Sequence, residues 1–297
     1  MSNPLFYGCG TALVTPFKGR RVDYDALEGL IDWQLEEGAD ALVVLGTTGE
    51  PATVSASERP AVIECAVARI RRRVPVIVGT GANDTREAVR LSIEAQALGA
   101  DALLVVTPYY NRASRSGLVA HFNAVADSVS LPVIMYNVPG RTGVNLPPET
   151  VAALARHPNL CAVKDASGDL RQLTDLAAAC GEGVAVYCGN DDQVVPAMAL
   201  GARGVISVAA NVVPRPMREL THAWLEGDPA KALEWQLRLL PLIRALFSEV
   251  SPIPVKAALS AMGLIENNLR LPLTPLDREK AEALVETLRK AGITVQS

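Results

Sequence analysis

The chain has 297 residues, 49% of them hydrophobic, so it can bury a large core, and its length suits a single α/β barrel. A formal net charge of −4 excludes the basic surface of a nucleic-acid-binding protein. No apolar run reaches the roughly 18 residues of a membrane span. The five cysteines show no paired spacing, which indicates reduced thiols and a cytoplasmic protein.

Two sequence patterns predict eight buried strands. In the first, a helix ends on Gly-Ala and a continuous apolar run follows, which is typical of a strand covered on both faces. In the second, proline is the first residue of the apolar run, a position where its missing N–H costs the sheet no hydrogen bond. Strands are expected within 10–14, 38–45, 74–79, 99–106, 131–136, 160–164, 185–188 and 201–208.

Stretches with an apolar period near 3.6 alternate with these strands and predict helices at 25–37, 57–71, 85–98 and 116–127. Eight such units predict an α/β fold, a (β/α)8 TIM barrel, over residues 1–227. A Rossmann-type sheet is the alternative, but its GxGxxG turn is missing after the first strand. Residues 228–297 read as a C-terminal helical extension, with helices at 230–247, 255–262 and 277–291 and a turn at 251–254.

The chemistry of such a barrel lies where the strands end. Lys164 ends one apolar strand and Tyr136 ends the strand before it. If the two strands are neighbours, an amine and a phenol project from one edge, about 5 Å apart. An ammonium group in water attacks poorly, whereas burial favours the neutral amine. The pair therefore predicts a lysine that forms an imine with a carbonyl substrate.

Other strand ends supply groups that bind carboxylates. The N–H groups of Thr47 and Thr48, in a Gly-Thr-Thr-Gly turn, suit one carboxylate, and the guanidinium of Arg141 suits a second. Two carboxylate sites around a lysine describe an aldolase that joins a 2-oxoacid to an acidic aldehyde. Asp191 and Asp192 are interpreted as a helix N-cap. No strand end carries a histidine, so we expect no metal and no cofactor beyond the imine.

Five segments in the same order resemble the dihydrodipicolinate synthase family. The resemblance covers about residues 8–276 and rests on 46–50 (GTTGE), 107–112 (TPYYNR), 136–143 (YNVPGRTG), 163–168 (VKDASG) and 252–256 (PIPVK). It implies a pyruvate-dependent lyase that condenses pyruvate with L-aspartate 4-semialdehyde at the entry to diaminopimelate and lysine synthesis. It also implies a homotetramer, built as a dimer of dimers.

The resemblance also implies roles for individual residues. Lys164 would form the Schiff base with pyruvate, and Tyr136 would be the general acid and base, linked through Thr47 to a Tyr110 supplied by a neighbouring subunit. The implied substrate-binding residues are Thr48 for pyruvate, Arg141 for the semialdehyde carboxylate, and Gly189 and Ile206 for the pocket wall.

The resemblance further implies a lysine effector site, at Ala52, Ala56, Arg59, Asn83, Glu87 and Tyr109. Lysine-inhibited members commonly carry histidines where this chain has Ala56 and Arg59. We therefore predict weak or absent inhibition by lysine. The chain also departs from the family pattern at Asp165, where a glutamate is usual. We expect this change to have little effect on function.

Three alternatives stay open at this level. A sister lyase that cleaves N-acetylneuraminate or a 2-keto-3-deoxy sugar acid would keep Lys164 and Tyr136, but it has no need of Arg141. A non-catalytic scaffold with a decayed site is the second alternative. A metal-dependent aldolase that uses Asp191 and Asp192 is the third.

Overall fold

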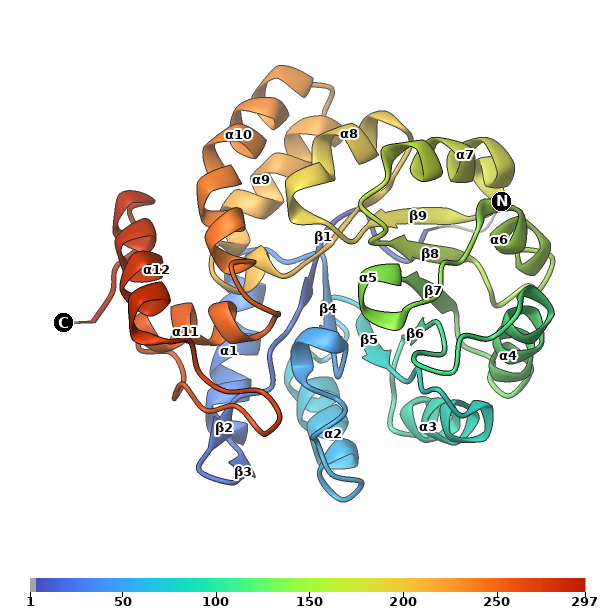
Figure 1. Cartoon of the computed structure of the whole chain (residues 1–297), viewed down its shortest axis with the longest axis horizontal. Helices are drawn as coiled ribbons and strands as arrows, with labels where there is room; N and C mark the ends of the chain where they lie inside the picture. The colour runs from blue at the N-terminus through green and yellow to red at the C-terminus, as the bar shows by residue number, and fades with distance from the viewer. Residues whose placement is uncertain (1–3, 297) are drawn as a thin grey trace.

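The computed structural model describes residues 4–296. The chain forms a closed barrel of parallel strands (Figure 1). Around the barrel the strands follow the order β1-β10-β9-β8-β7-β6-β5-β4. The TIM-barrel prediction is confirmed. The barrel strands are β1 (Gly8–Ala12), β4 (Ala41–Val44), β5 (Val76–Gly79), β6 (Ala102–Val106), β7 (Val133–Asn137), β8 (Ala162–Asp165), β9 (Ala185–Cys188) and β10 (Gly204–Ser207).

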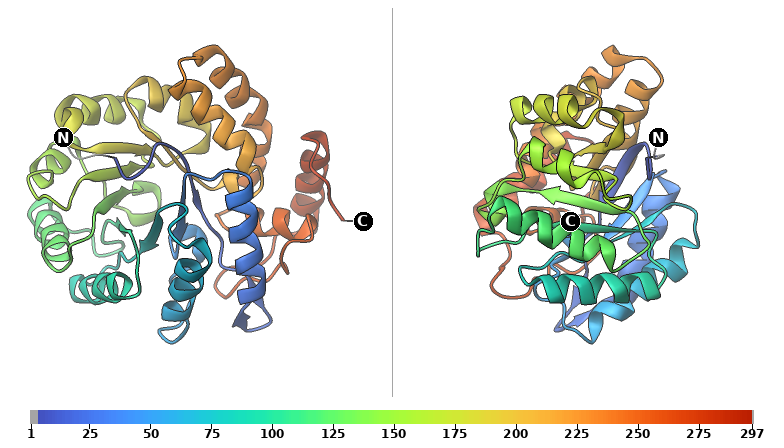
Figure 2. Two further views of the ribbon diagram at one scale, coloured as in Figure 1. Left: turned by 180° about the vertical axis from the view of Figure 1, so that it is seen from behind. Right: turned by 90° about the vertical axis from the view of Figure 1, so that its right-hand side faces the viewer.

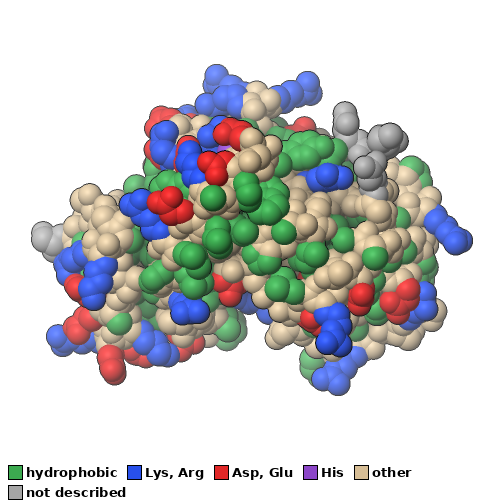
Figure 3. Space-filling model, turned by 90° about the horizontal axis from the view of Figure 1, so that it is seen from above, with side chains coloured by type: hydrophobic (Ala, Val, Ile, Leu, Met, Phe, Trp, Pro, Cys, Tyr) green, Lys and Arg blue, Asp and Glu red, His purple; other side chains and the backbone are tan. Residues whose placement is uncertain are grey.

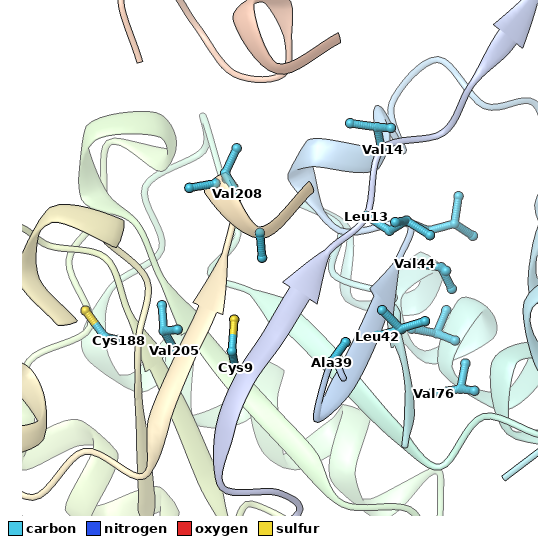
Figure 4. Packing of buried hydrophobic residues seen from close by; sticks show 14 of the residues in the cluster. Cys9, Leu13, Val14, Ala39, Leu42, Val44, Val76, Cys188, Val205 and Val208 are labelled. Carbon is cyan, nitrogen blue, oxygen red and sulfur yellow. The ribbon is translucent and has the colours of Figure 1, made fainter. Parts of the chain in front are cut away.

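The strands form because their residues are apolar on both faces. Along β6, Ala102 and Leu104 point into the barrel, and Leu103 and Val105 point outward against the helices. Figure 4 shows the outer layer on three neighbouring strands, where Cys9, Val205 and Cys188 stand side by side. All eight runs of this kind are strands, although the first is Gly8–Ala12 and not the expected 10–14.

Helices surround the barrel, and several begin at an aspartate whose carboxylate accepts a hydrogen bond from the first turn, as Asp23 and Asp84 do. The helices predicted between strands lie within two residues of their observed ends. The bounds are α1 (Tyr24–Glu36), α2 (Glu58–Ile70), α3 (Thr85–Ala97), α4 (Arg115–Asp127), α5 (Pro139–Thr142), α6 (Pro148–Leu154), α7 (Leu170–Cys180), α8 (Val194–Ala199) and α9 (Pro214–Leu225).

The amino-terminal end of the barrel is plugged by two aromatic rings. Phe6 and Tyr187 stack with their centroids 4.4 Å apart, and the Tyr187 hydroxyl donates to the Phe6 carbonyl at 2.8 Å. A small hairpin, β2 (Phe17–Lys18) with β3 (Arg21–Val22), follows the first strand. Because one end is filled, substrates can approach only from the carboxyl end of the strands.

The C-terminal residues form α10 (Pro229–Leu246), α11 (Ile253–Ala261) and α12 (Arg278–Lys290). Figures 1 and 2 place α12 outside the ring of helices, where it packs on α10 and α11. Ile253 and Pro254 form the first turn of α11, so the predicted turn at 251–254 is wrong in its second half: proline is accepted at the start of a helix. The domain boundary after residue 227 stays a prediction, and residues 1–3 and 297 lie outside the described residues.

None of the helices in residues 4–296 is long and apolar enough to cross a bilayer. The five cysteines are all free thiols.

Candidate active site

Lys164 and Tyr136 are direct partners in the ladder between β8 and β7. Both side chains point into the barrel near its carboxyl end, and they are buried, with 4% and 6% exposure. The Lys164 amine lies 4.4 Å from the centre of the Tyr136 ring. The predicted amine and phenol are therefore brought together on one edge, inside the barrel.

Two of the predicted lining residues surround this amine. Ile206 on β10 is fully buried and belongs to the same inner layer as Tyr136. Gly189 follows β9, and a Cβ atom there would lie 3.1 Å from Lys164 Cε and 2.6 Å from the Cβ of Ala166. Contacts this short leave no room for a side chain, so glycine keeps the space beside the lysine open.

The Gly-Thr-Thr-Gly sequence forms a short 3-10 turn, Thr47–Gly49, directly after the end of β4. Thr48 is buried and Thr47 is half-buried. The N–H groups that open a helical turn have no partner within it, so those of Thr47 and Thr48 are suited to bind an anion. The turn lies at the carboxyl end of the barrel, as Lys164 does.

Arg141 lies on α5, a single helical turn after β7. Pro139 opens this single turn and Gly143, in the left-handed conformation, closes it, so local sequence sets both ends. The Arg141 side chain is exposed at the rim, and its Nη2 donates to the carbonyl of Ser251 at 3.0 Å. The remaining N–H groups of the guanidinium are available to a carboxylate.

Tyr110 is not part of the cavity within one chain. It is 89% exposed, its backbone has a positive φ of 73°, and its N–H donates to the Thr142 carbonyl at 3.2 Å. A large aromatic ring held in a strained conformation and pointed away from the protein is unusual. The ring has no function visible within its own subunit.

The prediction that Asp191 is a helix N-cap is wrong. Asp191 is 1% exposed, and its Oδ2 accepts from the N–H groups of Val208 and Ala209 at 3.0 and 2.9 Å. Burial raises the pKa of this carboxyl, while the Lys164 charge acts in the opposite direction. Asp191 therefore ties the segment after β9 to the segment after β10, beside the amine.

A buried polar network lies directly behind the Lys164 and Tyr136 pair. Asn137 and Asp165, the next residues on each strand, are also register partners, and the Asn137 Nδ2 donates to Asp165 Oδ2 at 2.9 Å. The Asn137 Oδ1 accepts from the N–H of Leu146 at 2.9 Å, which anchors the chain after α5. The sequence alone predicts no role for this pair, and the only signal for one is that they directly follow Tyr136 and Lys164.

Among the side chains that the structure describes, no cluster of three or more histidine, cysteine, aspartate or glutamate residues is suited to a metal.

Comparison with known proteins agrees with this geometry. Residues 5–291 match the model of the Dihydrodipicolinate synthetase family. The chain belongs to this family. The 4-hydroxy-tetrahydrodipicolinate synthase of Alkaliphilus oremlandii is 50% identical over 289 residues, which are 97% of this chain and 100% of that protein. The synthase of Acetivibrio thermocellus is 47% identical over 99% of this chain and 100% of its own length.

Solved structures of the family superpose closely. The dihydrodipicolinate synthase of Thermotoga maritima is 42% identical, with a TM-score of 0.97 over 98% of this chain and 100% of that one. The chloride-inhibited enzyme of Acinetobacter baumannii, crystallised with pyruvate, is 45% identical, with a TM-score of 0.95 over 97% and 99%. The predicted family and the predicted lyase activity of a 4-hydroxy-tetrahydrodipicolinate synthase are thereby confirmed.

The structure places the six residues of the implied effector site on neighbouring loops and helices. Ala52 and Ala56 precede α2 and are exposed. Asn83 and Tyr109 are also exposed. The Asn83 carbonyl accepts a hydrogen bond from the side chain of Asn111, in the loop of Tyr109. Arg59 is the exception, because it is 8% exposed and its Nη2 donates to the Gly79 carbonyl at 2.9 Å.

Burial lowers the pKa of the Arg59 guanidinium, and the charge of Glu87 opposes that shift. The Arg59 guanidinium is therefore a cation of the chain itself within electrostatic range of Glu87, whose carboxylate is paired with Arg90 at 2.8 Å.

Proposed function

We propose that Lys164 forms an imine with pyruvate and that the resulting enamine attacks L-aspartate 4-semialdehyde. The observation that carries the proposal is the buried Lys164 amine, 4.4 Å from the Tyr136 ring and at the open end of a barrel whose other end is plugged. The Acinetobacter baumannii relative, with pyruvate bound, supports the choice of substrate.

The reaction begins when the neutral amine of Lys164 adds to the keto carbon of pyruvate. The carbinolamine loses water and becomes a protonated imine, which draws electrons from the methyl group. Loss of a methyl proton gives the enamine, so the lysine itself supplies the electron sink and the step needs no added cofactor. Tyr136, beside the amine, accepts and returns these protons.

The enamine carbon then attacks the aldehyde carbon, a carbon–carbon bond forms, and the aldehyde oxygen takes up a proton. The amine of the semialdehyde displaces Lys164 by transimination, which closes the ring and frees the enzyme. Thr47 and Thr48 hold the pyruvate carboxylate, and Thr47 also passes protons to and from Tyr136. Arg141 holds the carboxylate of the semialdehyde.

Tyr110 completes the site of a neighbouring subunit in this proposal. Its exposed, strained position agrees with such a role, and the assembly is the expected homotetramer, a dimer of dimers, in the cytoplasm. Exposed apolar side chains on α10, Leu233 and Leu237, leave a surface suited to association. Figure 3 shows apolar side chains gathered on the face that includes this helix.

Borohydride trapping tests the proposal. Wild type incubated with pyruvate and borohydride should gain one covalent adduct at Lys164, located by peptide mass spectrometry. Lys164→Ala should gain none, whereas Lys18→Ala, which removes an exposed lysine, should match wild type. A wild-type protein without an adduct contradicts the mechanism.

A coupled assay then tests the second substrate. Turnover is expected with pyruvate and aspartate semialdehyde. Cleavage of N-acetylneuraminate or of 2-keto-3-deoxy sugar acids alone would assign the chain to the sister lyases.

A further inference from the structure

A fully buried ion pair joins the turn of Thr47 and Thr48 to the C-terminal helix α11. Glu50 directly follows the turn, and Lys256 is the fourth residue of α11. The Lys256 amine is 2.5 Å from Glu50 Oε1, and the two side chains are 0% and 1% exposed. The residues are far apart in sequence, so the contact is made only by the folded chain.

The buried Lys256 amine depends on Glu50 for compensation of its charge. Its Nζ donates to the carbonyl of Asn268 at 2.9 Å and lies 4.0 Å from the centre of the Phe17 ring. Burial lowers the pKa of Lys256 to about 8, and the charge of Glu50 acts against that shift. Glu50 is the carboxylate that compensates this buried charge, because a carbonyl and a ring face carry only partial charges.

The backbone of Glu50 is where the turn ends. Glu50 has left-handed dihedral angles, φ 52° and ψ 46°, which a residue with a side chain adopts only at a cost. Its N–H donates to the Thr47 carbonyl at 3.2 Å. On the other side of the turn, the Thr15 hydroxyl donates to the Gly49 carbonyl at 2.7 Å. The buried ion pair therefore fixes the side chain of the residue at the strained end of the turn.

We propose that Glu50 and Lys256 are positioning residues that hold the Thr47–Thr48 turn in the geometry that binds the substrate carboxylate. The inference rests on the proposed function, in which this turn binds pyruvate. The same C-terminal segment also contacts the second carboxylate site, because the carbonyl of Ser251 accepts from Arg141. The segment before and within α11 therefore supports both sites, although it carries none of the reacting groups.

A purely structural ion pair would stabilise the protein without affecting pyruvate binding, and the first experiment separates the two roles. Glu50→Gln keeps the shape of the side chain and removes its charge. Asp40→Asn is the matched control at the opposite end of the barrel, where Asp40 accepts from the Cys9 N–H at 2.8 Å and lies 3.0 Å from His222.

We expect Glu50→Gln to raise the KM for pyruvate about tenfold and to lower kcat as well, because a displaced turn moves both the carboxylate-binding N–H groups and Thr47. Asp40→Asn should lower the melting temperature and leave this KM unchanged. Equal KM values for wild type and Glu50→Gln would overturn the proposal.

Hydrogen exchange of the free enzyme gives a readout that needs no substrate. Amides of residues 46–50 should exchange faster in Glu50→Gln than in wild type, and Asp40→Asn should show no change there. Unchanged exchange at residues 46–50 counts against the proposal. Should wild type form no adduct with pyruvate, the proposed function fails, while the exchange result still decides whether the ion pair holds the turn.

A double variant covers the case in which Glu50→Gln does not fold. Glu50→Met combined with Lys256→Met removes both buried charges together, a change that proteins often tolerate. This variant should fold and still show the raised pyruvate KM and the faster exchange at residues 46–50. Wild-type values for both measurements would overturn the positioning role.

Discussion

The Lys164 amine lies over the face of the Tyr136 ring, and the two residues face each other across the β7–β8 ladder. Ladder hydrogen bonds fix both backbones, and both side chains are buried, so the pair has little freedom to separate. The hydroxyl on the same ring is left for proton transfer, so one side chain holds the lysine and supports its chemistry.

Removal of this hydroxyl should separate the two contributions. Tyr136→Phe keeps the ring and is expected to lower kcat by about 10²- to 10³-fold, because proton transfer loses its carrier. The measurement is steady-state turnover with both substrates. The control is Tyr187→Phe, which removes a hydroxyl bonded to the Phe6 carbonyl at the plugged end and should cost about 1 kcal/mol of stability without a loss of kcat. A kcat for Tyr136→Phe within threefold of wild type would refute the assignment.

Gly189 offers a steric test of the pocket. Gly189→Ala would place a methyl group 3.1 Å from Lys164 Cε and 2.6 Å from the Ala166 Cβ, so the lysine must move. We expect imine formation with pyruvate to slow by about tenfold or more, measured by timed borohydride quenching. Gly29→Ala in α1 meets no atom within 4 Å and should trap pyruvate at the wild-type rate. Equal rates in the two variants would show that the pocket does not reach Gly189.

Arg141 should act on one substrate only. Arg141→Lys keeps the charge but loses the planar fork, so the KM for aspartate semialdehyde should rise about tenfold. The KM for pyruvate should stay within twofold of wild type. Arg86→Lys, at a side chain 94% exposed, serves as control. An equal rise in both KM values would mean that Arg141 does not select the aldehyde.

Much of the fold could be predicted from sequence because the signals are local. The strand after Gly99 and the helix after Asp84 depend on their own apolar pattern, cap and turn residues, and all lie near their expected places. The contact between Lys164 and Tyr136 could be predicted from sequence because consecutive strands of a barrel are neighbours. Residues at the same position on two such strands therefore lie side by side.

The rest of the site depends on contacts between distant residues. Asp191 has the local pattern of a helix cap, but its carboxylate accepts from the N–H of Val208 after β10, and only the pairing of β9 with β10 brings these together. Glu50 and Lys256 lie much farther apart in the chain, and only the folded protein brings them together. Tyr110 is exposed within one chain, and its proposed role needs a second copy of the protein.

The Arg270–Glu58 pair should make stability depend on pH in acid. The hydrogen bonds from Arg270, at 2.6 and 2.7 Å, lower the pKa of Glu58 from 4.5 to about 2. Because the folded state binds this proton less readily than the unfolded state, the stabilisation is complete above pH 4.5. It is lost as the pH falls from 4.5 towards 2.

Glu58→Gln should therefore lower the free energy of unfolding at neutral pH by about 1–2 kcal/mol, after allowance for partial exposure. The gap between its melting temperature and that of wild type should narrow as the pH falls through this window. Glu282→Gln, in an exposed pair with Arg278, should show no such trend. A gap that stays constant with pH would contradict the assignment.

Lysine should inhibit this enzyme weakly or not at all, because Arg59 adds a positive charge of the chain itself to the implied effector site. The side chain is buried and bonded to the Gly79 carbonyl, so it cannot easily swing aside for a cationic ligand. Inhibition assays should show little effect of L-lysine up to millimolar concentrations. Arg59→His, which reduces this charge at neutral pH, should increase sensitivity, whereas Arg86→His, at the exposed start of α3, should not. A micromolar inhibition constant for wild type would refute the prediction and show that Arg59 leaves room for the effector.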